Sequence, residues 1–232
     1  MTTQGQQAAE AWSDPAIANA WVERDAAVNL LDLPRAIAAE LVAAEPPASG
    51  VVLDIGSGPG AFLAAVLDRL PDTTGVWSDA SATMREHAEA NLARFGGRVR
   101  FVMADMTALG GADLPRDVGV VLSSRATHHL DVAALHSFYA DTAGRLVPGG
   151  WLINLDHVGP SDVWDRRLRA IRPGFVGRSG GESTHHHNYP LAAESDHLAG
   201  YAAAGIDDVE IAWKAFYTCL FAGKKPTAAT DH

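Results

Sequence analysis

The sequence predicts an α/β fold in which helices cover both faces of a doubly wound, mostly parallel, seven-stranded sheet. From residue 51 onward, apolar runs of strand length alternate with amphipathic segments of about 10 to 15 residues, which is typical of right-handed crossovers between parallel strands. Near the end of the chain, VEIAWKAF and YTCLFAGKK lie so close together that only an antiparallel hairpin fits.

Residues 1–48 precede this alternation, and we expect them to form an N-terminal helical lid. Their apolar residues recur at loosely helical spacing. Pro34 can open a helix, because a proline in the first turn loses no hydrogen bond, and PPASG then ends that helix.

The strands and helices follow in order. The predicted strands span 51–55, 74–78, 99–104, 118–124, 151–156, 209–216 and 217–225. The predicted helices span 61–70, 81–95, 131–146, 161–172 and 190–205. Ser81 and Asp131 are suitable N-caps, and Gly205 is a typical helix stop. We therefore expect a single domain over 49–225, with a helix and loop insertion over the active site at 159–190 and a disordered tail at 226–232.

Composition excludes several classes of protein. Lys and Arg total 18 against 28 Asp and Glu, so the net charge is −10, and the absence of a basic run argues against nucleic acid as a partner. The single cysteine, Cys219, excludes an internal disulfide and is expected to be a buried strand thiol. Because we see neither a leader-like start nor an apolar run of about 18 residues, we expect a cytoplasmic protein without membrane contact.

The stretch VLDIGSGPGAF at 52–62 indicates a ligand site, because glycines between a strand and a helix let the backbone turn sharply and approach a bound molecule. Gly56, Gly58 and Ala61 satisfy the pattern G-x-G-x-x-[G/A], which by itself permits a dinucleotide. Asp54 stands two residues before Gly56 and extends the pattern to D-x-G-x-G-x-G.

Six segments in order make a longer pattern: LDIGSGPGAFL, GVWSDASATM, VRFVMADM, VVLSSRATHHLD, LVPGGWLINLDHV and AAGIDDVEIAWKAFYTCLFAGKK. With them, residues 51–223 resemble the class I S-adenosylmethionine-dependent methyltransferases, in particular the members that act on small molecules. The resemblance implies a Rossmann-like sheet, S-adenosylmethionine as cofactor and a small-molecule substrate, and it leaves a homodimer open.

The resemblance also implies a set of cofactor contacts. Asp54 and the backbone from Gly56 to Gly60 face the methionine part, and Asp79, about 20 residues after the glycine turn, accepts the ribose hydroxyls. Asp105 accepts the adenine amino group. The full expected set is Asp54, Gly56, Ser57, Gly58, Gly60, Asp79, Ala80, Met84, Asp105, Met106, Ser123 and Arg24. A strand-end aspartate alone is also a common helix cap, and Met84 alone is also a typical core residue.

Residues for the chemistry are expected after the fourth and fifth strands, because reacting groups collect at the carboxyl ends of parallel strands. His157 follows the fifth strand and is our first candidate for a general base. Arg125, His128 and His129 follow the fourth strand and are candidates for binding the substrate, although capping and structural roles are alternatives.

The stretch HHHNYP at 185–190 concentrates further ionisable groups. We expect His186, His187 and Tyr189 to belong to a polar acceptor pocket with catalytic functions, with a solvated loop as the alternative. Three adjacent imidazoles also permit a metal site completed by His128, His129 or Glu182. We predict no metal, because no HExxH and no paired cysteines occur.

In the lid, Trp12 and Trp21 are candidate substrate contacts that can seal the cleft together with Arg24, and core packing is the alternative.

The sequence thus predicts an S-adenosylmethionine-dependent methyltransferase that modifies oxygen, nitrogen or carbon of a small molecule. Three alternatives stay open: an NAD-dependent oxidoreductase, disfavoured because no Y-x-x-x-K pair occurs; a non-catalytic module that binds the cofactor; and a tRNA methyltransferase, disfavoured by the charge.

Overall fold

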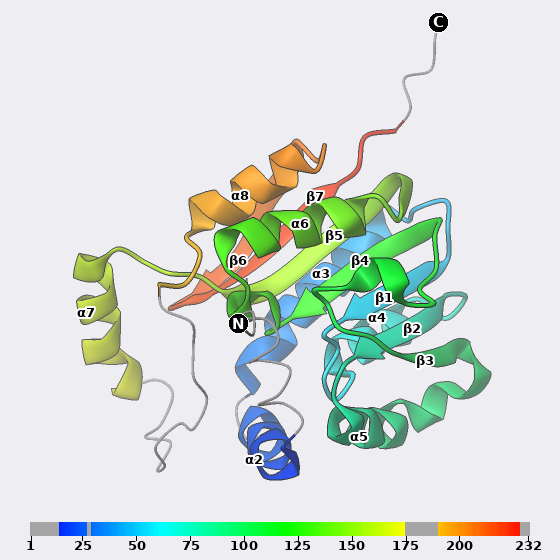
Figure 1. The fold of residues 1–232 in the computed structure, drawn as a ribbon, viewed down its shortest axis with the longest axis horizontal. Helices are drawn as coiled ribbons and strands as arrows, with labels where there is room; N and C mark the ends of the chain where they lie inside the picture. The colour runs from blue at the N-terminus through cyan, green and yellow to red at the C-terminus, as the bar shows by residue number, and fades with distance from the viewer. Residues whose placement is uncertain (1–13, 27–28, 175–189, 228–232) are drawn as a thin grey trace, which may run out of the picture.

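A computed structural model of the chain describes residues 14–26, 29–174 and 190–227. Its centre is a seven-stranded sheet of order β3-β2-β1-β4-β5-β7-β6 (Figure 1). The strands are β1 (Val51–Ile55), β2 (Thr74–Asp79), β3 (Val99–Met103), β4 (Val118–Ser124), β5 (Leu146–His157), β6 (Asp208–Ala215) and β7 (Thr218–Lys224). Neighbouring strands from β3 to β5 pair in parallel, and β7 pairs antiparallel with both β5 and β6. The predicted fold class is confirmed.

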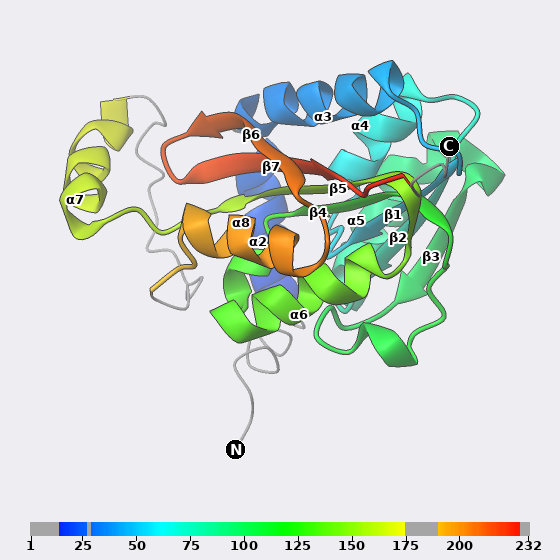
Figure 2. The same cartoon turned by 90° about the horizontal axis from the view of Figure 1, so that it is seen from above.

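Helices cover both faces of the sheet. They are α2 (Pro15–Ala26), α3 (Asp32–Ala44), α4 (Ala61–Arg69), α5 (Ala82–Leu92), α6 (Val132–Ala143), α7 (Asp162–Ile171) and α8 (Glu194–Ala203). Figure 2 shows α3 and α4 on one face and α6 and α8 on the other, with the strands between them. This arrangement follows from right-handed crossovers between parallel strands.

Each face of the sheet has its own hydrophobic core, because successive strand residues point to opposite sides. On the side of α3, α4 and α5, Val52 and Trp77 pack with helix residues such as Phe62. On the side of α6 and α8, Leu53 and Cys219 pack with residues such as Tyr139. The central strands are therefore buried on both faces, and Cys219 is the buried strand thiol that was predicted.

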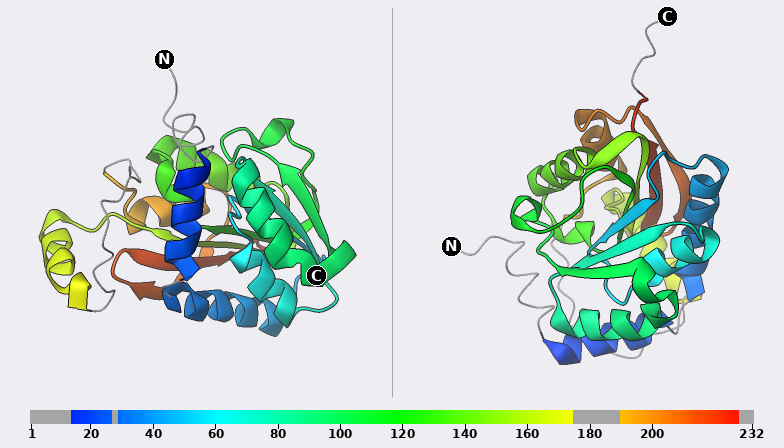
Figure 3. Two further views of the ribbon diagram at one scale, coloured as in Figure 1. Left: turned by 90° about the horizontal axis from the view of Figure 1, so that it is seen from below. Right: turned by 90° about the vertical axis from the view of Figure 1, so that its right-hand side faces the viewer.

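Two helices extend beyond these layers. Figure 3 shows α2 beside α5, where the His87 imidazole and the Asn19 side chain lie 2.7 Å apart. Helix α7 has no buried residue and stands away from the sheet in Figures 1 and 2. The Tyr217 hydroxyl, from the turn between β6 and β7, donates to the Asp165 carboxylate of α7 at 2.9 Å.

Several local predictions can be checked. Ser81 and Asp131 cap α5 and α6, accepting hydrogen bonds from the N–H groups of Met84 and Ala134. β5 begins earlier than expected, at Leu146, because Leu146 already pairs with Val118 before the glycine turn of LVPGG. No helix within the described ranges is long and apolar enough to cross a membrane.

Candidate active site

The turn from β1 into α4 brings three glycines to the carboxyl edge of the sheet. Gly56, Gly58 and Gly60 have φ angles of +64°, +52° and +83°, in the left-handed region that favours glycine. A Cβ on Gly56 would lie 2.5 Å from the Cβ of Ala126, so the loop after β4 also requires glycine there. The Gly58 carbonyl accepts a 2.8 Å hydrogen bond from the Trp77 indole. The backbone of this turn is therefore held in place by β2 and by the loop after β4.

Asp54, on β1, is fully buried beside this turn. Its Oδ2 accepts hydrogen bonds from the Ser57 hydroxyl at 2.6 Å and from the Leu63 N–H at 3.2 Å. Its Oδ1 has no hydrogen-bond partner among the described residues. Burial raises the pKa of the Asp54 carboxyl to about 7, although the hydrogen bonds from Ser57 and Leu63 act to lower it. This carboxyl therefore has an unused acceptor atom, and a bound cation would favour its charged form.

Asp79 ends β2 and turns its carboxylate toward the same place. Its two oxygens accept hydrogen bonds of 2.9 Å from the N–H groups of Gly58 and Ser81. Burial raises the pKa of this carboxyl, while those backbone hydrogen bonds act to lower it. Each carboxylate oxygen can accept more than one hydrogen bond, so a vicinal diol could bind here without displacing either backbone donor.

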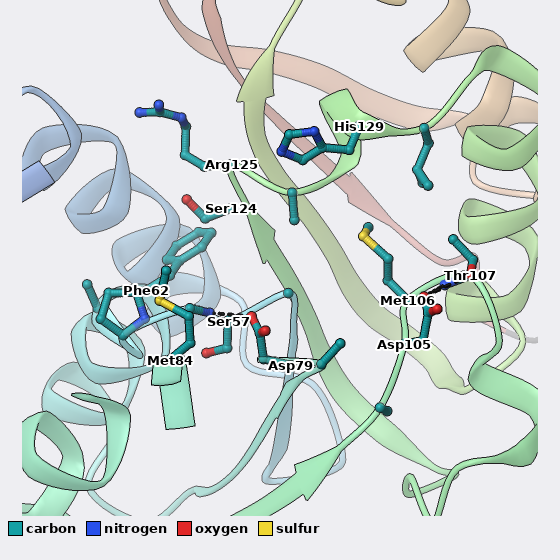
Figure 4. Close-up of a pocket in the computed structure, with 18 of the residues that line it drawn as sticks. Ser57, Phe62, Asp79, Met84, Asp105, Met106, Thr107, Ser124, Arg125 and His129 are labelled. Carbon is teal, nitrogen blue, oxygen red and sulfur yellow. Dashed lines mark hydrogen bonds between the residues drawn. The ribbon is translucent and has the colours of Figure 1, made fainter. Parts of the chain in front are cut away.

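Asp105 follows β3 and is half-buried. Its Oδ1 accepts hydrogen bonds from both the N–H and the hydroxyl of Thr107, each at 2.8 Å. These two bonds hold the loop after β3 beside Met106 (Figure 4).

One cavity at the carboxyl ends of β1, β2, β3 and β4 is bordered by the glycine turn, Asp79 and Asp105 (Figure 4). It is lined by Arg35, Gly56, Ser57, Gly58, Pro59, Ala61, Phe62, Asp79, Ala80, Met84, Ala104, Asp105, Met106, Thr107, Ser124, Arg125, Ala126, His129 and Leu130. Apolar side chains thus dominate the wall, with carboxylates from two strand ends, which is typical of a small-molecule site.

The loop after β4 forms the opposite wall of the cavity. Arg125 has φ +56°, which is uncommon for a residue other than glycine, and its N–H donates to the Leu155 carbonyl at 3.0 Å. Figure 4 shows Arg125, Ser124 and His129 along this wall, across from Asp79 and Met84. The Ser124 hydroxyl is buried without a partner among the described residues.

Asp156, on β5, holds this loop from behind. The carboxylate is fully buried, and its Oδ2 accepts hydrogen bonds from the Ala126 N–H at 3.0 Å, the Thr127 hydroxyl at 2.7 Å and the His128 N–H at 3.1 Å. Its Oδ1 accepts from His128 Nδ1 at 2.6 Å and from the His157 N–H at 2.7 Å. Burial alone would raise the pKa of the Asp156 carboxyl, but His128, His157 and Thr127 hold it well below its usual range.

The three histidines of this region lie together. The His128 and His129 rings have centroids 4.1 Å apart, and the His157 ring is 5.3 Å from His128. His157 Nδ1 also lies 3.0 Å from the Thr218 hydroxyl. Among these three residues, His129 lines the cavity and the other two do not.

Ten predicted site residues line the cavity: Gly56, Ser57, Gly58, Asp79, Ala80, Met84, Asp105, Met106, Arg125 and His129. Others are not among its described lining residues: Asp54, Gly60, Ser123, His128 and His157. Ser123 is replaced on the wall by its neighbour Ser124, because successive residues of a strand point to opposite faces.

Further predictions fall outside what the structure describes. Trp12, Glu182, His185, His186, His187 and Tyr189 lie outside the described residues. Trp21 and Arg24 belong to α2, but their side chains are outside the description as well. Within the described ranges, no group of three histidine, cysteine, aspartate or glutamate side chains is placed to hold a metal ion.

Five residues of the region had not been singled out from the sequence: Arg35, Phe62, Thr107, Ser124 and Asp156. Arg35 belongs to α3, its side chain is 11% exposed, and its charge acts on the Asp54 carboxyl. Thr107 could have been found from the D-M-T order after the third strand, since a threonine two residues after an aspartate often bonds back to it. Asp156 ends the apolar run WLINLD, a strand-end position that the same reasoning had favoured at Asp79.

Comparison with known proteins adds a family assignment to this geometry. Residues 52–150 match the family model described as a methyltransferase domain. This segment of the chain therefore resembles a methyltransferase domain. That match, together with the fold, confirms the resemblance to class I S-adenosylmethionine-dependent methyltransferases that the six sequence segments had indicated.

Solved structures of methyltransferases share the fold. An O-methyltransferase family protein from Burkholderia thailandensis is 24% identical with a TM-score of 0.66, over 88% of this chain and 59% of its own. A provisionally assigned O-methyltransferase from Nostoc punctiforme is 20% identical with a TM-score of 0.67, over 87% and 58%. The chain thus spans less than two thirds of either neighbour.

A shorter neighbour matches over nearly its whole length. A provisionally assigned methyltransferase from Bacillus halodurans is 18% identical with a TM-score of 0.57, over 82% of this chain and 98% of its own. A search of curated protein sequences finds no match.

Proposed function

We propose that this protein is a cytoplasmic enzyme that transfers the methyl group of S-adenosylmethionine to a small-molecule acceptor. The observation that carries the proposal is the placement of three carboxylates at one edge of the sheet: Asp79 at the end of β2 and Asp105 after β3 line the cavity, and Asp54 is buried beside the glycine turn that also lines it. The methyltransferase domain match over residues 52–150 supports the same reading.

The residues present fit this cofactor. Asp54 has a buried Oδ1 without a partner among the described residues, which suits the ammonium group of a methionine moiety. Asp79 would hold the ribose hydroxyls, Asp105 and the Met106 N–H would hold the adenine, and Met84 would pack against the ring. Asp79, Asp105, Met106 and Met84 line the cavity. When bound, S-adenosylmethionine supplies an electrophilic methyl group on a sulfonium sulfur.

The other wall of the cavity would receive the acceptor. The residues from Ser124 to Leu130 come from the carboxyl end of β4, where ligands of open α/β sheets bind. A methyl transfer in line requires the acceptor to be oriented and kept from water rather than activated by many groups. The apolar wall residues, Ala126 and Leu130 among them, serve that purpose.

We also retain the proposal that residues 1–48 form a lid on the domain at 49–225. Support comes from α3, which contributes Arg35 to the cavity wall, and from α2, which lies beside α5. The segment before β1 therefore contributes to the proposed cofactor site through α3 and packs beside α5 through α2. The insertion at 159–190 stays a proposal for the acceptor side, with α7 as its described part.

The proposal is tested by calorimetric titration of the purified protein with S-adenosylhomocysteine, and with NADH in parallel. We expect micromolar binding of S-adenosylhomocysteine and none of NADH. The variant Asp79→Ala should lose most of the affinity, because it removes the acceptor for the ribose hydroxyls. Glu89→Ala, which removes an exposed carboxylate that pairs with Arg85 on α5, is the matched control and should bind normally.

A second variant separates the amino-acid part of the ligand from the nucleoside. Asp54→Asn should bind S-adenosylhomocysteine about tenfold more weakly, because a hydrogen bond between charged groups is lost. Its affinity for methylthioadenosine, which has no ammonium group, should not change. Heat with NADH and silence with S-adenosylhomocysteine would instead assign the glycine turn to a dinucleotide and overturn the proposal.

A further inference from the structure

Helix α7 presents apolar side chains to solvent, although nothing in the proposed methyl transfer requires them there. It has no buried residue, and Val163, Trp164 and Ile171 are 46%, 55% and 52% exposed. They are three of the six large apolar side chains that are exposed among the described residues. Positions i, i+7 and i+8 of a helix share one side, so these side chains form one apolar strip. Clustered apolar side chains of this kind, unlike scattered ones, mark surfaces that bind a partner.

The same helix is a basic segment of an acidic chain. Residues 162–172 contain four arginines and two aspartates, so their net charge is +2, whereas the whole chain carries −10. The Arg167 guanidinium lies 5.0 Å from the centroid of the Trp164 ring, so cationic and apolar groups belong to one surface. We call this surface, residues 162–172, the α7 patch. A partner that fits it is acidic.

An acidic surface of this kind lies on the same chain, at the opposite end of β6. Asp207, Asp208 and Glu210 are exposed at the start of that strand. The α7 patch lies near its end, because the Tyr217 hydroxyl in the turn after β6 donates to the Asp165 carboxylate at 2.9 Å. Figures 1 and 2 show α7 beyond the turn that joins β6 to β7. Eight residues of strand, roughly 25 Å, separate the two surfaces, so they do not neutralise each other within one molecule.

β6 is also the last strand on its side of the sheet. The strand order ends with β7-β6, so in the described part of the chain no strand pairs with the outer edge of β6. A second molecule can therefore approach along this edge. The register of β6 shifts between Ile211 and Trp213, which interrupts the edge. Side chains at the two ends of β6, rather than a continuous backbone ladder, would therefore make such a contact.

Two-fold symmetry would bring the two charged surfaces together. If two copies lie with their β6 strands antiparallel, the end of each β6 lies beside the start of the other. The α7 patch of each copy then meets the acidic start of β6 in its partner. The same contact forms twice, so the interface is closed and self-complementary.

We propose that the α7 patch and the acidic start of β6, residues 207–210, form the interface of a homodimer in which each copy supplies both surfaces. The occupant of the α7 patch is therefore a second copy of this chain. An anionic membrane fits less well: the residues outside the patch carry −12, because the patch contributes +2 to the total of −10, and a negative surface would repel them. This inference does not rest on the proposed methyl transfer.

Sedimentation equilibrium of the full chain tests the dimer at protein concentrations from about 1 µM to about 1 mM, a range that covers weak and moderate association. We expect a reversible equilibrium between monomer and dimer that weakens as salt is raised, because the charged contacts are exposed. Trp164→Ala should weaken dimerisation about tenfold or more, because it removes an aromatic anchor. Leu33→Ala, which truncates a side chain of α3 that is 59% exposed, is the matched control and should dimerise normally.

Charge reversal tests the partner itself, because only a second copy of the chain can restore the contact. The double variant Arg166→Glu/Arg167→Glu makes the α7 patch acidic. The double variant Asp207→Arg/Asp208→Arg makes the start of β6 basic. Each variant alone should dimerise about 100-fold more weakly or less, because like charges then meet at both contacts. An equimolar mixture of the two should form a 1:1 heterodimer, because each contact again joins opposite charges.

The control for charge reversal lies near the opposite edge of the sheet. Arg100→Glu/Arg116→Glu changes the net charge as much as the α7 variant does, at exposed residues of β3 and of the segment between β3 and β4. It should dimerise like the wild-type protein. Far-UV circular dichroism and thermal unfolding of every variant separate a lost contact from a lost fold.

Three results would overturn the proposal. The first is a wild-type protein that stays monomeric up to about 1 mM, and if this monomer sediments with vesicles of phosphatidylcholine and phosphatidylglycerol, the α7 patch binds a membrane surface instead. The second is a dimer that survives both charge reversals, which would place the interface elsewhere. The third is a pair of charge-reversed monomers that do not associate when mixed. None of these results depends on binding of S-adenosylhomocysteine, so the dimer and the proposed methyl transfer can fail separately.

Discussion

Two fully buried aspartates at the ends of central strands differ in how completely they are hydrogen-bonded. Asp156, on β5, accepts five hydrogen bonds, and the pKa of its carboxyl is held well below its usual range. Asp54, on β1, accepts two hydrogen bonds, and burial raises the pKa of its carboxyl to about 7. Burial is the same in both, so the charge and hydrogen bonds that His128, His157 and Thr127 supply to Asp156 decide which carboxyl keeps its charge.

This difference in hydrogen bonding distinguishes a carboxylate that positions a loop, Asp156, from one that can bind a ligand, Asp54. Asp156 is satisfied within the chain, and its charge organises the loop that carries His128 and His129. Asp54 has one oxygen without a partner in the described part of the chain. A hydrogen-bond donor on a bound ligand would therefore stabilise its charged form. A ligand cation that supplies this donor would make the environment of Asp54 resemble that of Asp156.

The largest expected effect is at Asp156. Asp156→Ala leaves several buried donors without an acceptor, so we expect the free energy of unfolding to fall by about 3–5 kcal/mol. Urea denaturation at neutral pH measures this. The control is Asp113→Ala, which removes a carboxylate that is 95% exposed in its pair with Arg100 and should cost less than about 1 kcal/mol. Similar losses in the two variants would contradict the distinction between buried and exposed pairs.

Asp54 and Asp156 should make the free energy of unfolding depend on pH in opposite directions. The unfolded carboxyl releases its proton near its ordinary pKa of 3.8, whereas the folded one keeps it to about 7, so stability falls as pH rises through that window. Asp54→Asn cannot titrate. The stability of wild-type protein relative to this variant should therefore drop by on the order of 3 kcal/mol between about pH 4 and pH 7.

Urea denaturation at several pH values tests this without cofactor. Asp156 acts in a different window: its folded pKa is lowered, so its contribution is present above about pH 4 and is lost only as pH falls further. Saturating S-adenosylhomocysteine should reduce the drop seen with Asp54, since the bound ammonium favours the carboxylate. A parallel pH profile of the two proteins would show that Asp54 ionises normally and is already satisfied.

Gly56 links the two regions physically, because the turn after β1 packs on Ala126 of the acceptor wall. Gly56→Ala would place a Cβ 2.5 Å from the Ala126 Cβ, in addition to requiring φ +64°. Gly205→Ala also requires a positive φ, of +77°, but meets no atom within 4 Å, so it serves as the control for the cost of a positive φ. We expect Gly56→Ala to lower the free energy of unfolding by about 1–3 kcal/mol more than Gly205→Ala, as for overpacking.

Thermal or urea unfolding of both glycine variants gives this difference directly. Equal losses would mean that the Ala126 loop moves away at no cost, and the two walls of the cavity would then be independent.

The sequence predicted the fold and the cofactor side because both depend on order along the chain. The alternation of strands and helices determines the sheet, and Asp79 and Asp105 stand directly after strands whose carboxyl ends share one edge. The acceptor side depends on details that periodicity does not contain. One residue of register decides that Ser124 rather than Ser123 lines the cavity, and the loop that brings His129 to the cavity contains a positive φ at Arg125.

Long-range contacts were also hidden from the sequence. Asp156 was predicted only as part of a strand, and its neighbour His157 was preferred as the base, because the convergence of five donors on one carboxylate exists only in the folded chain. Arg35 lies about 20 residues before the glycine turn. No helical or strand periodicity relates the two segments, so the sequence could not show that they meet in the fold.

The smallest expected effect concerns Arg35, the cation on the cofactor side. Arg35 lines the cavity and its charge acts to lower the pKa of the Asp54 carboxyl, so we expect it to hold the carboxylate of an amino-acid ligand while Asp54 holds the ammonium. Arg35→Met keeps an apolar stem of similar length and should weaken S-adenosylhomocysteine by about three- to tenfold, the size of one hydrogen bond, and leave methylthioadenosine unchanged. Arg69→Met, which removes an exposed pair with Glu40 on the neighbouring surface, should affect neither ligand. Calorimetry with both ligands decides the point: equal weakening of both would place Arg35 in the packing of α3 rather than in ligand binding. The role of Asp54 as the half-satisfied member of the pair would then depend on the ammonium alone.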